Sequence, residues 1–201
     1  FYCCTKLTSV VIPNRVRSIG ERAFKNCTGL TSVTIPNSVR SIGEHAFDSC
    51  TGLTSVVIPS SVNTIGWSAF MDCTGLTSVV IPNSVTTIGN YAFDGCTNLT
   101  IYCEAESKPS DWESKWNYSD CPVYWYSENE PSTSGNYWHY VNGEPTVWEI
   151  LKKDYREAYM KKNGRKIFLL AGCFVLLAGC GNHTADVTPA NATTEETVSA
   201  G

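Results

Sequence analysis

The chain contains little charge and little histidine. Only 17% of its 201 residues are charged, the formal net charge is −4, and there are three histidines. This composition argues against nucleic acid as a partner, because phosphate backbones are bound through clusters of Lys and Arg. The sequence also lacks a nucleophile elbow, a phosphate-binding loop and a zinc-helix motif. We therefore expect neither an enzyme nor a cofactor.

The ten cysteines lack the spacing of a metal site. No Cys-x-x-Cys pair is present, and no histidine stands at ligand spacing from a cysteine pair. The sequence therefore predicts no metal centre.

The chain does contain an internal repeat with a period of 23 residues. The same phrase begins at Cys4, Cys27, Cys50 and Cys73, and a fifth copy opens at Cys96 and diverges after Leu99. A unit this short cannot bury its own apolar side, whereas stacked copies bury it between them. The repeat therefore predicts a solenoid in which identical side chains form columns, namely Leu7, Leu30, Leu53, Leu76 and Leu99; Phe24, Phe47, Phe70 and Phe93; and Cys4, Cys27, Cys50, Cys73 and Cys96.

Each copy combines two kinds of apolar spacing. In the second copy, residues 30–35 alternate as a short strand does, and residues 39–42 form a second short apolar segment. Ala46, Phe47 and Cys50 have the i, i+1, i+4 spacing of one inward helical face. The expected fold class is therefore an α/β repeat solenoid with a helical segment in every coil.

The repeated phrase Leu-Thr-Ser-Val-x-Ile-Pro-x-x-Val-x-x-Ile-Gly-x-x-Ala-Phe-x-x-Cys, within residues 1–103, resembles the leucine-rich repeat of bacterial BspA-like surface proteins. The resemblance implies a right-handed coil and an extracellular or cell-surface location. It also implies adhesion or recognition without catalysis, by a monomer whose partner is a host or microbial surface protein or glycan. It carries over no fixed binding residues. Phe1 occupies the Ala-Phe position of a preceding coil, so we expect the solenoid of residues 1–103 to be truncated at its N-terminus.

The five cysteines of the repeat are expected to act as small buried hydrophobes. Cys103 and Cys121 lie outside the column, and they either pair in an oxidising compartment or stay free.

Within the repeats, the candidate binding residues are Tyr91 and, above all, Trp67. Trp67 replaces Glu21 and Glu44 of the earlier copies, on the turn that precedes the Ala-Phe pair. An exposed indole at this place would anchor a partner. The alternative is that it packs against Tyr91 in the next coil.

Residues 104–148 contain five of the six tryptophans. Ser110–Glu113 has a capping-box pattern, which predicts a short helix carrying Trp112 and Trp116. Residues 122–126, 136–141 and 146–148 are expected to be strands, with a hairpin turn at Asn142–Gly143. Residues 104–148 form either a small aromatic, β-rich C-terminal cap that covers the last coil, or a carbohydrate-binding module that uses the aromatic residues of 112–148. The second hypothesis places a binding platform at Trp125, Tyr137, Trp138 and Tyr140. A further alternative makes the whole chain a structural spacer of a larger surface protein.

The C-terminal part of the chain, residues 149–201, contains a segment that is typical of an N-terminus. Residues 149–166 are expected to be a charged helix or linker, and 181–201 a disordered Thr/Ala/Glu tail. Between them, residues 160–180 resemble a bacterial lipoprotein signal peptide that ends in Leu-Ala-Gly-Cys180. If Met160 is a true start, this part belongs to a different protein and Cys180 is its lipid-attachment site. The alternatives are a membrane anchor at 167–180, although a span needs about 20 apolar residues, and a buried helix.

Overall fold

The computed structural model describes residues 1–148. The expected charged helix or linker at 149–166, the signal-like or anchor segment at 167–180 and the tail at 181–201 lie outside the described residues. Within residues 1–148, no helix is long and apolar enough to cross a membrane.

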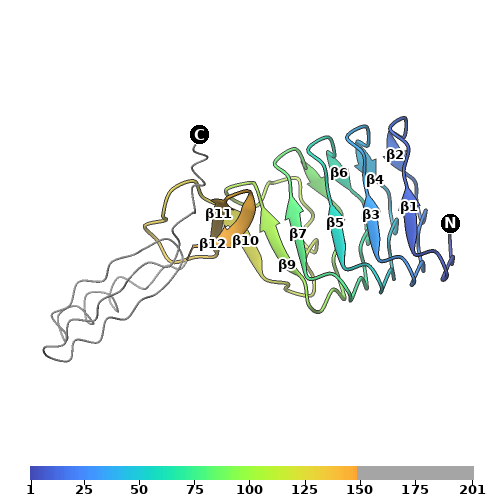
Figure 1. Cartoon of the computed structure of the whole chain (residues 1–201). Helices are drawn as coiled ribbons and strands as arrows, with labels where there is room; N and C mark the ends of the chain where they lie inside the picture. The colour runs from blue at the N-terminus through green and yellow to red at the C-terminus, as the bar shows by residue number, and fades with distance from the viewer. Residues whose placement is uncertain (149–201) are drawn as a thin grey trace, which may run out of the picture. The chain divides into compact units, whose positions relative to one another are not determined.

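Each of the first four coils contributes one strand to each of two rows of parallel strands (Figure 1). The first row is divided into two hydrogen-bonded sheets, between its third and fourth strands. The first row consists of β1 (Ser9–Val11), β3 (Ser32–Thr34), β5 (Ser55–Val57), β7 (Ser78–Ile81) and β9 (Thr100–Cys103). The second row consists of β2 (Ser18–Ile19), β4 (Ser41–Ile42), β6 (Thr64–Ile65) and β8 (Thr87–Ile88). Ser9 pairs with Ser32, and Ser32 with Ser55, so the register follows the 23-residue period. The repeat solenoid is therefore confirmed.

The third side of each coil is a turn segment, and the expected helix is not found there. Residues 1–148 contain strands and turns but no helix, so the α part of the α/β class is not confirmed in this region. The N–H groups of His45, Phe47 and Ser49 donate to Trp67, Ala69 and Met71 of the next coil, at 2.8–2.9 Å. The N–H groups between them close tight turns within the coil instead, as from Ala46 to Gly43. Since alternate donors bond to the next coil, they cannot make the i to i−4 bonds of an α-helix.

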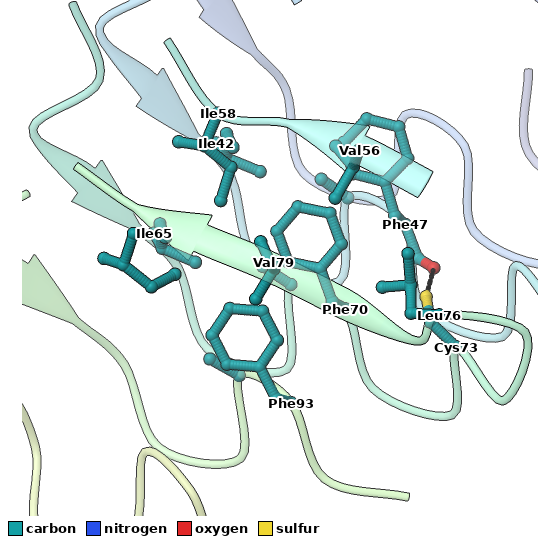
Figure 2. Packing of buried hydrophobic residues seen from close by; sticks show 14 of the residues in the cluster. Ile42, Phe47, Val56, Ile58, Ile65, Phe70, Cys73, Leu76, Val79 and Phe93 are labelled. Carbon is teal, nitrogen blue, oxygen red and sulfur yellow. Dashed lines mark hydrogen bonds between the residues drawn. The ribbon is translucent and has the colours of Figure 1, made fainter. Parts of the chain in front are cut away.

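Identical side chains fill the space between the three sides in stacked columns (Figure 2). The rings of Phe47 and Phe70 are stacked at 5.2 Å, and those of Phe70 and Phe93 at 5.5 Å. The thiol of Cys73 donates to the Phe47 carbonyl at 3.1 Å, and other cysteines of the column repeat this contact. Cys27, Cys50, Cys73 and Cys96 are buried as predicted. Cys4 is exposed, because its coil has a neighbour on one side only.

The fifth coil keeps its place in the stack although its sequence diverges from the repeat. Ile101 pairs with Val79, although the separation of these two residues is one less than the 23-residue period. Because the strands pair in this register, the Ile101 side chain points into the core as that of Val79 does. Trp112 is buried and donates from Nε1 to the Val85 carbonyl at 3.1 Å. Trp116 packs edge-on against Phe93 with ring centroids 6.3 Å apart. The predicted helix at Ser110–Glu113 is wrong, because this segment forms turns whose backbone bonds to the preceding coil, as from Glu113 to Ile88.

Cys103 and Cys121 are separate thiols. Cys121 approaches the Cys96 carbonyl at 3.5 Å and so extends the cysteine column. Cys103, in strand β9, pairs with Ile81 of strand β7. Both thiols are buried and free, which answers the open question of a disulfide between them.

Three strands extend the first row beyond β9 (Figure 1). Strand β10 (Val123–Tyr126) is parallel to β9, and β11 (Tyr137–Val141) is parallel to β10. Strand β12 (Glu144–Val147) returns antiparallel to β11. The turn between them is Asn142–Gly143, with φ of 52° and 84°. The predicted Asn-Gly hairpin is confirmed, because both central residues adopt the left-handed conformation that such a turn requires.

Candidate functional site

An open groove of about 540 Å³ runs across the turn segments of successive coils. Side chains from four coils line it: Lys25 and Asn26; His45, Asp48 and Ser49; Trp67, Ser68, Met71 and Asp72; Tyr91 and Asp94. These positions differ from coil to coil, whereas the neighbouring inward positions are repeated. The groove is therefore the surface on which otherwise similar coils acquire different chemistry.

The turn segments hold several residues of the groove in an unusual backbone conformation. His45 and Ser49 have φ of 53° and 59°, and Ser68 and Asp72 have 52° and 56°. Positive φ is uncommon outside glycine. Here it recurs in each coil and places alternate N–H groups toward the next coil, so the intercoil bonds maintain this conformation.

A buried carboxylate lies at the N-terminal part of the groove. Asp48 accepts hydrogen bonds from Lys25 Nζ at 2.6 Å, from His45 Nδ1 at 2.7 Å and from Ser49 Oγ at 2.7 Å. Its side chain is only 5% exposed. Burial alone would raise the pKa of Asp48, but the bonds from Lys25, Ser49 and His45 outweigh it and hold the pKa below its usual range. Lys25 and Asp48 therefore neutralise each other, and the site joins two coils.

Four rings form a row along the groove, which we call the aromatic ridge: His45, Trp67, Tyr91 and Tyr118. Successive ring centroids lie 4.6, 6.4 and 5.2 Å apart, all in edge-to-face arrangements. His45, Ser68 and Tyr91 occupy the same repeat position in three successive coils. Because Ser68 is small, it leaves a gap between the other two rings. The indole of the adjacent Trp67 fills that gap. The packing of Trp67 against Tyr91 is thus confirmed, while Trp67 also remains 43% exposed.

One cation already lies against the end of the ridge. Lys115 Nζ is 5.8 Å from the centroid of the Tyr91 ring and 5.9 Å from that of Tyr118. This geometry is that of a cation–π contact.

The remaining polar groups of the groove lack a cationic partner. Asp94 accepts from Ser119 Oγ and from the Gly95 amide at 3.1 Å. Among residues 1–148, no Lys, Arg or His lies within ion-pair distance of Asp72 or Asp94. Ser68 is only 1% exposed, and its Oγ has no hydrogen-bond partner in the described part of the chain. This half of the groove is therefore acidic and incompletely satisfied.

The aromatic residues of β10 and β11 do not form one platform. Trp125 pairs with Tyr137, and Tyr126 with Trp138, so Trp125 and Trp138 lie on opposite faces of the sheet. The Trp138 side chain is fully buried and donates from Nε1 to the Cys103 carbonyl at 2.8 Å. Trp125 is half-buried, with its ring centroid 6.0 Å from that of Trp112. Trp125 packs against the solenoid core, whereas Trp138 is buried on the other face of the sheet against Tyr102, Tyr126 and Tyr140.

Tyr140 is the most exposed of the candidates in this region. It is 43% exposed, and its hydroxyl donates to Glu104 at 2.7 Å. Partial burial and the neighbouring carboxylate raise the pKa of Tyr140 to about 12. It therefore stays a neutral donor, already engaged with Glu104.

Sequence reasoning identified Trp67 and Tyr91 but missed Asp48, Ser68 and Tyr118. The signal for Asp48 was its separation of one period from Lys25, which brings opposite charges together in adjacent coils. Among residues 1–148, no group of three or more His, Cys, Asp or Glu is placed to hold a metal ion.

Comparison with known proteins relates this architecture to bacterial repeat proteins. The family profile described as BspA type Leucine rich repeat region matches residues 1–110, with six copies. A leucine-rich repeat protein of T. pallidum is 42% identical, with a TM-score of 0.50; the match covers 51% of this chain and 48% of that one. A leucine-rich repeat protein from Bacteroides ovatus is 39% identical, with a TM-score of 0.49, covering 56% and 28%. The chain thus spans about half, or less, of these proteins. No curated protein matches it.

Proposed function

The chain belongs to the BspA-type leucine-rich repeat family, and on that premise we propose that it is a cell-surface recognition module that binds a partner protein through the groove. Leucine-rich repeat proteins generally mediate protein binding and are typically not catalytic. We place this binding role at the groove and its aromatic ridge. Trp67 and Tyr91 are the proposed contact residues.

The observation that carries the proposal is the exposure of Trp67 in an otherwise regular solenoid. An indole that is 43% exposed leaves apolar surface in water, which is unfavourable for the free protein. Trp and Tyr dominate the binding energy of protein interfaces when they become buried against a partner. Polar side chains flank Trp67 in the groove, as the rim of an interface requires.

The proposed setting is the extracellular surface, with a host or microbial surface protein as the partner. It is supported by family membership, because the resemblance to BspA-like surface proteins implies a cell-surface location.

Binding of the purified full chain to intact epithelial and bacterial cells tests the proposal. We expect Trp67→Ala to weaken binding about thirtyfold or more, since truncation of a hot-spot residue costs at least about 2 kcal/mol. Tyr2→Ala is the matched control, because Tyr2 is 57% exposed and lies outside the groove. Pretreating the cells with protease should abolish binding.

Two results would contradict this function. Equal binding by wild type and Trp67→Ala would show that the groove is not the recognition surface. Binding that survives protease but is removed by glycosidases would favour the glycan alternative, and Tyr140→Ala would then test the aromatic C-terminal segment. Circular dichroism of each variant establishes that it is folded.

A further inference from the structure

We propose that the acidic half of the groove takes a Lys- or Arg-bearing peptide segment of the partner, with a cationic side chain between Trp67 and the carboxylates of Asp72 and Asp94. This inference rests on the proposed function, because it assumes that the groove is where the partner binds.

Charge is distributed unevenly along the groove. Lys25 is paired with Asp48, whose carboxylate is buried and also bonded to His45 and Ser49, so neither group is free for a ligand. Asp72 and Asp94 line the same groove with no basic side chain at ion-pair distance among residues 1–148. Two carboxylates without counter-charge favour a cationic ligand over a neutral one.

The exposed ring beside these carboxylates favours the same ligand. Lys115 already places its ammonium against Tyr91 and Tyr118, which shows how a cation meets this ridge. Trp is the best aromatic partner for a cation, yet Trp67 has no such contact in the described region. The flexible thioether of Met71 supplies apolar surface for the stem of a lysine or arginine.

Ser68 provides an independent sign of a missing ligand group. Its hydroxyl is buried under the neighbouring Trp67, lines the groove and has no hydrogen-bond partner within residues 1–148. Buried polar groups are normally paired, because an unpaired one loses its hydration without compensation. A guanidinium or ammonium that enters beside Trp67 would donate to Ser68 Oγ. A neutral sugar would leave the two carboxylates without counter-charge.

Calorimetric titration of the full chain with simple probes tests the inference. The probes are the peptides (Arg-Gly)5, (Lys-Gly)5 and (Glu-Gly)5, together with cellohexaose as a neutral oligosaccharide. We expect the two basic peptides to bind, with affinity that falls as salt is raised, and the other two probes not to bind. The double variant Asp72→Asn/Asp94→Asn should weaken basic-peptide binding about tenfold or more, because the attraction between charges is lost.

The variants are chosen to stay folded. Asn tolerates the left-handed backbone of Asp72, with φ of 56°, and at Asp94 it still accepts from the Gly95 amide. The matched control is Glu128→Gln/Glu130→Gln, which makes the same change of net charge at two exposed residues outside the groove. This control should leave binding within about twofold of wild type, because distant exposed charges are screened.

Three outcomes would overturn the inference. They are the absence of basic-peptide binding, an equal loss in the two double variants, and cellohexaose binding that depends on Trp67. If cells still bind the chain through Trp67 in any of these cases, only the cationic occupant is excluded and the proposed function stands. If Trp67→Ala changes neither cell nor peptide binding, both proposals fail.

Discussion

Two adjacent columns of the same coils follow opposite rules. Phe24, Phe47, Phe70 and Phe93 form one column, and the residues that follow them form the other: Lys25, Asp48, Met71 and Asp94. The first points inward, where each ring must match the spacing of its neighbours, so the same residue recurs. The second lines the groove, where a side chain is limited only by contacts with the residues one coil away. A strict period can therefore preserve a core and vary a surface at neighbouring positions.

Thiol reactivity gives the largest expected contrast between inside and outside. Cys3 and Cys4 are exposed, whereas Cys50 and Cys73 are fully buried. Burial raises the pKa of Cys50 to about 12, and the thiolate is the reactive form. We expect iodoacetamide at pH 8 to label Cys3 and Cys4 about 10³-fold or more faster than Cys50 and Cys73, which react only through rare opening. Peptide mapping by mass spectrometry measures each rate, and similar rates at all four sites would contradict the buried column.

Truncating an inward ring should give the largest loss of stability. Phe70 is fully buried between Phe47 and Phe93, so Phe70→Ala should lower the free energy of unfolding by about 3–5 kcal/mol. The control is Phe1→Ala in the same column, where the ring is 66% exposed and stacks on Phe24 alone. We expect a loss below about 1 kcal/mol there. Urea denaturation followed by circular dichroism compares them, and equal losses would contradict the packing.

Glycine at the entrance of the turn segment allows close approach of the coils. A Cβ at Gly66 would lie 2.7 Å from the backbone nitrogen of Glu44, whereas a Cβ at Gly20 would meet nothing within 4 Å. We expect Gly66→Ala to lower the free energy of unfolding by about 1–3 kcal/mol, because backbone must move. Gly20→Ala should be neutral or stabilising by up to about 1 kcal/mol. Urea melts of both variants test this, and a neutral Gly66→Ala would mean that the coils are more loosely stacked.

The buried carboxylate of the groove should contribute stability that depends on pH. The folded pKa of Asp48 is lowered, so its contribution is complete above the unfolded pKa near 3.8 and is lost as pH falls through the folded value. At pH 7, Asp48→Asn should lower the free energy of unfolding by about 1–3 kcal/mol, because charge-assisted bonds are weakened. The difference from wild type should shrink as the pH is lowered below about 4.

Asp111→Asn is the control for this experiment. Asp111 is exposed, and its carboxylate accepts a bond from the neighbouring Ser110. It should change stability by less than about 0.5 kcal/mol at either pH. A difference between Asp48→Asn and wild type that stays constant from pH 7 to pH 3 would show that the charge of Asp48 is not what stabilises the fold.

The columns of the core could be predicted from the sequence, because a constant period leaves one consistent way to stack the copies. The third side could not be assigned correctly. Ala46, Phe47 and Cys50 have inward spacing that suits a helix and a series of tight turns equally well. What separates the two is where the N–H groups of His45 and Phe47 go, and those bonds lead to another coil. Spacing within one copy does not reveal a partner one period away.

The turn part of the fifth coil was missed because both the length and the residues of this coil change. Trp112 and Trp116 take interior places with larger rings, and Cys121 follows Cys96 by more than one period. The position of Cys121 was the available signal, because its thiol resumes the column after the longer coil.

The candidate site was only partly predictable for a related reason. Trp67 stood out as an exception to the repeat, and its packing on Tyr91 followed from their positions in adjacent coils. The gap at Ser68 depends on the size of residues in two neighbouring columns, and Tyr118 comes from the irregular fifth coil. The groove is a property of several coils together, and no single copy contains its pattern.

The bonds between coils give the solenoid a direction of mechanical weakness. On all three sides, backbone hydrogen bonds join one coil to the next and therefore run along the stacking direction. Tension that pulls the first coil away from the last therefore acts on the hydrogen bonds of one coil boundary at a time. We expect an optical-trap experiment with such loading to record extension in a series of small steps at low force. Load applied across the coils acts on many of these bonds at once, so resistance to force depends on where the solenoid is held.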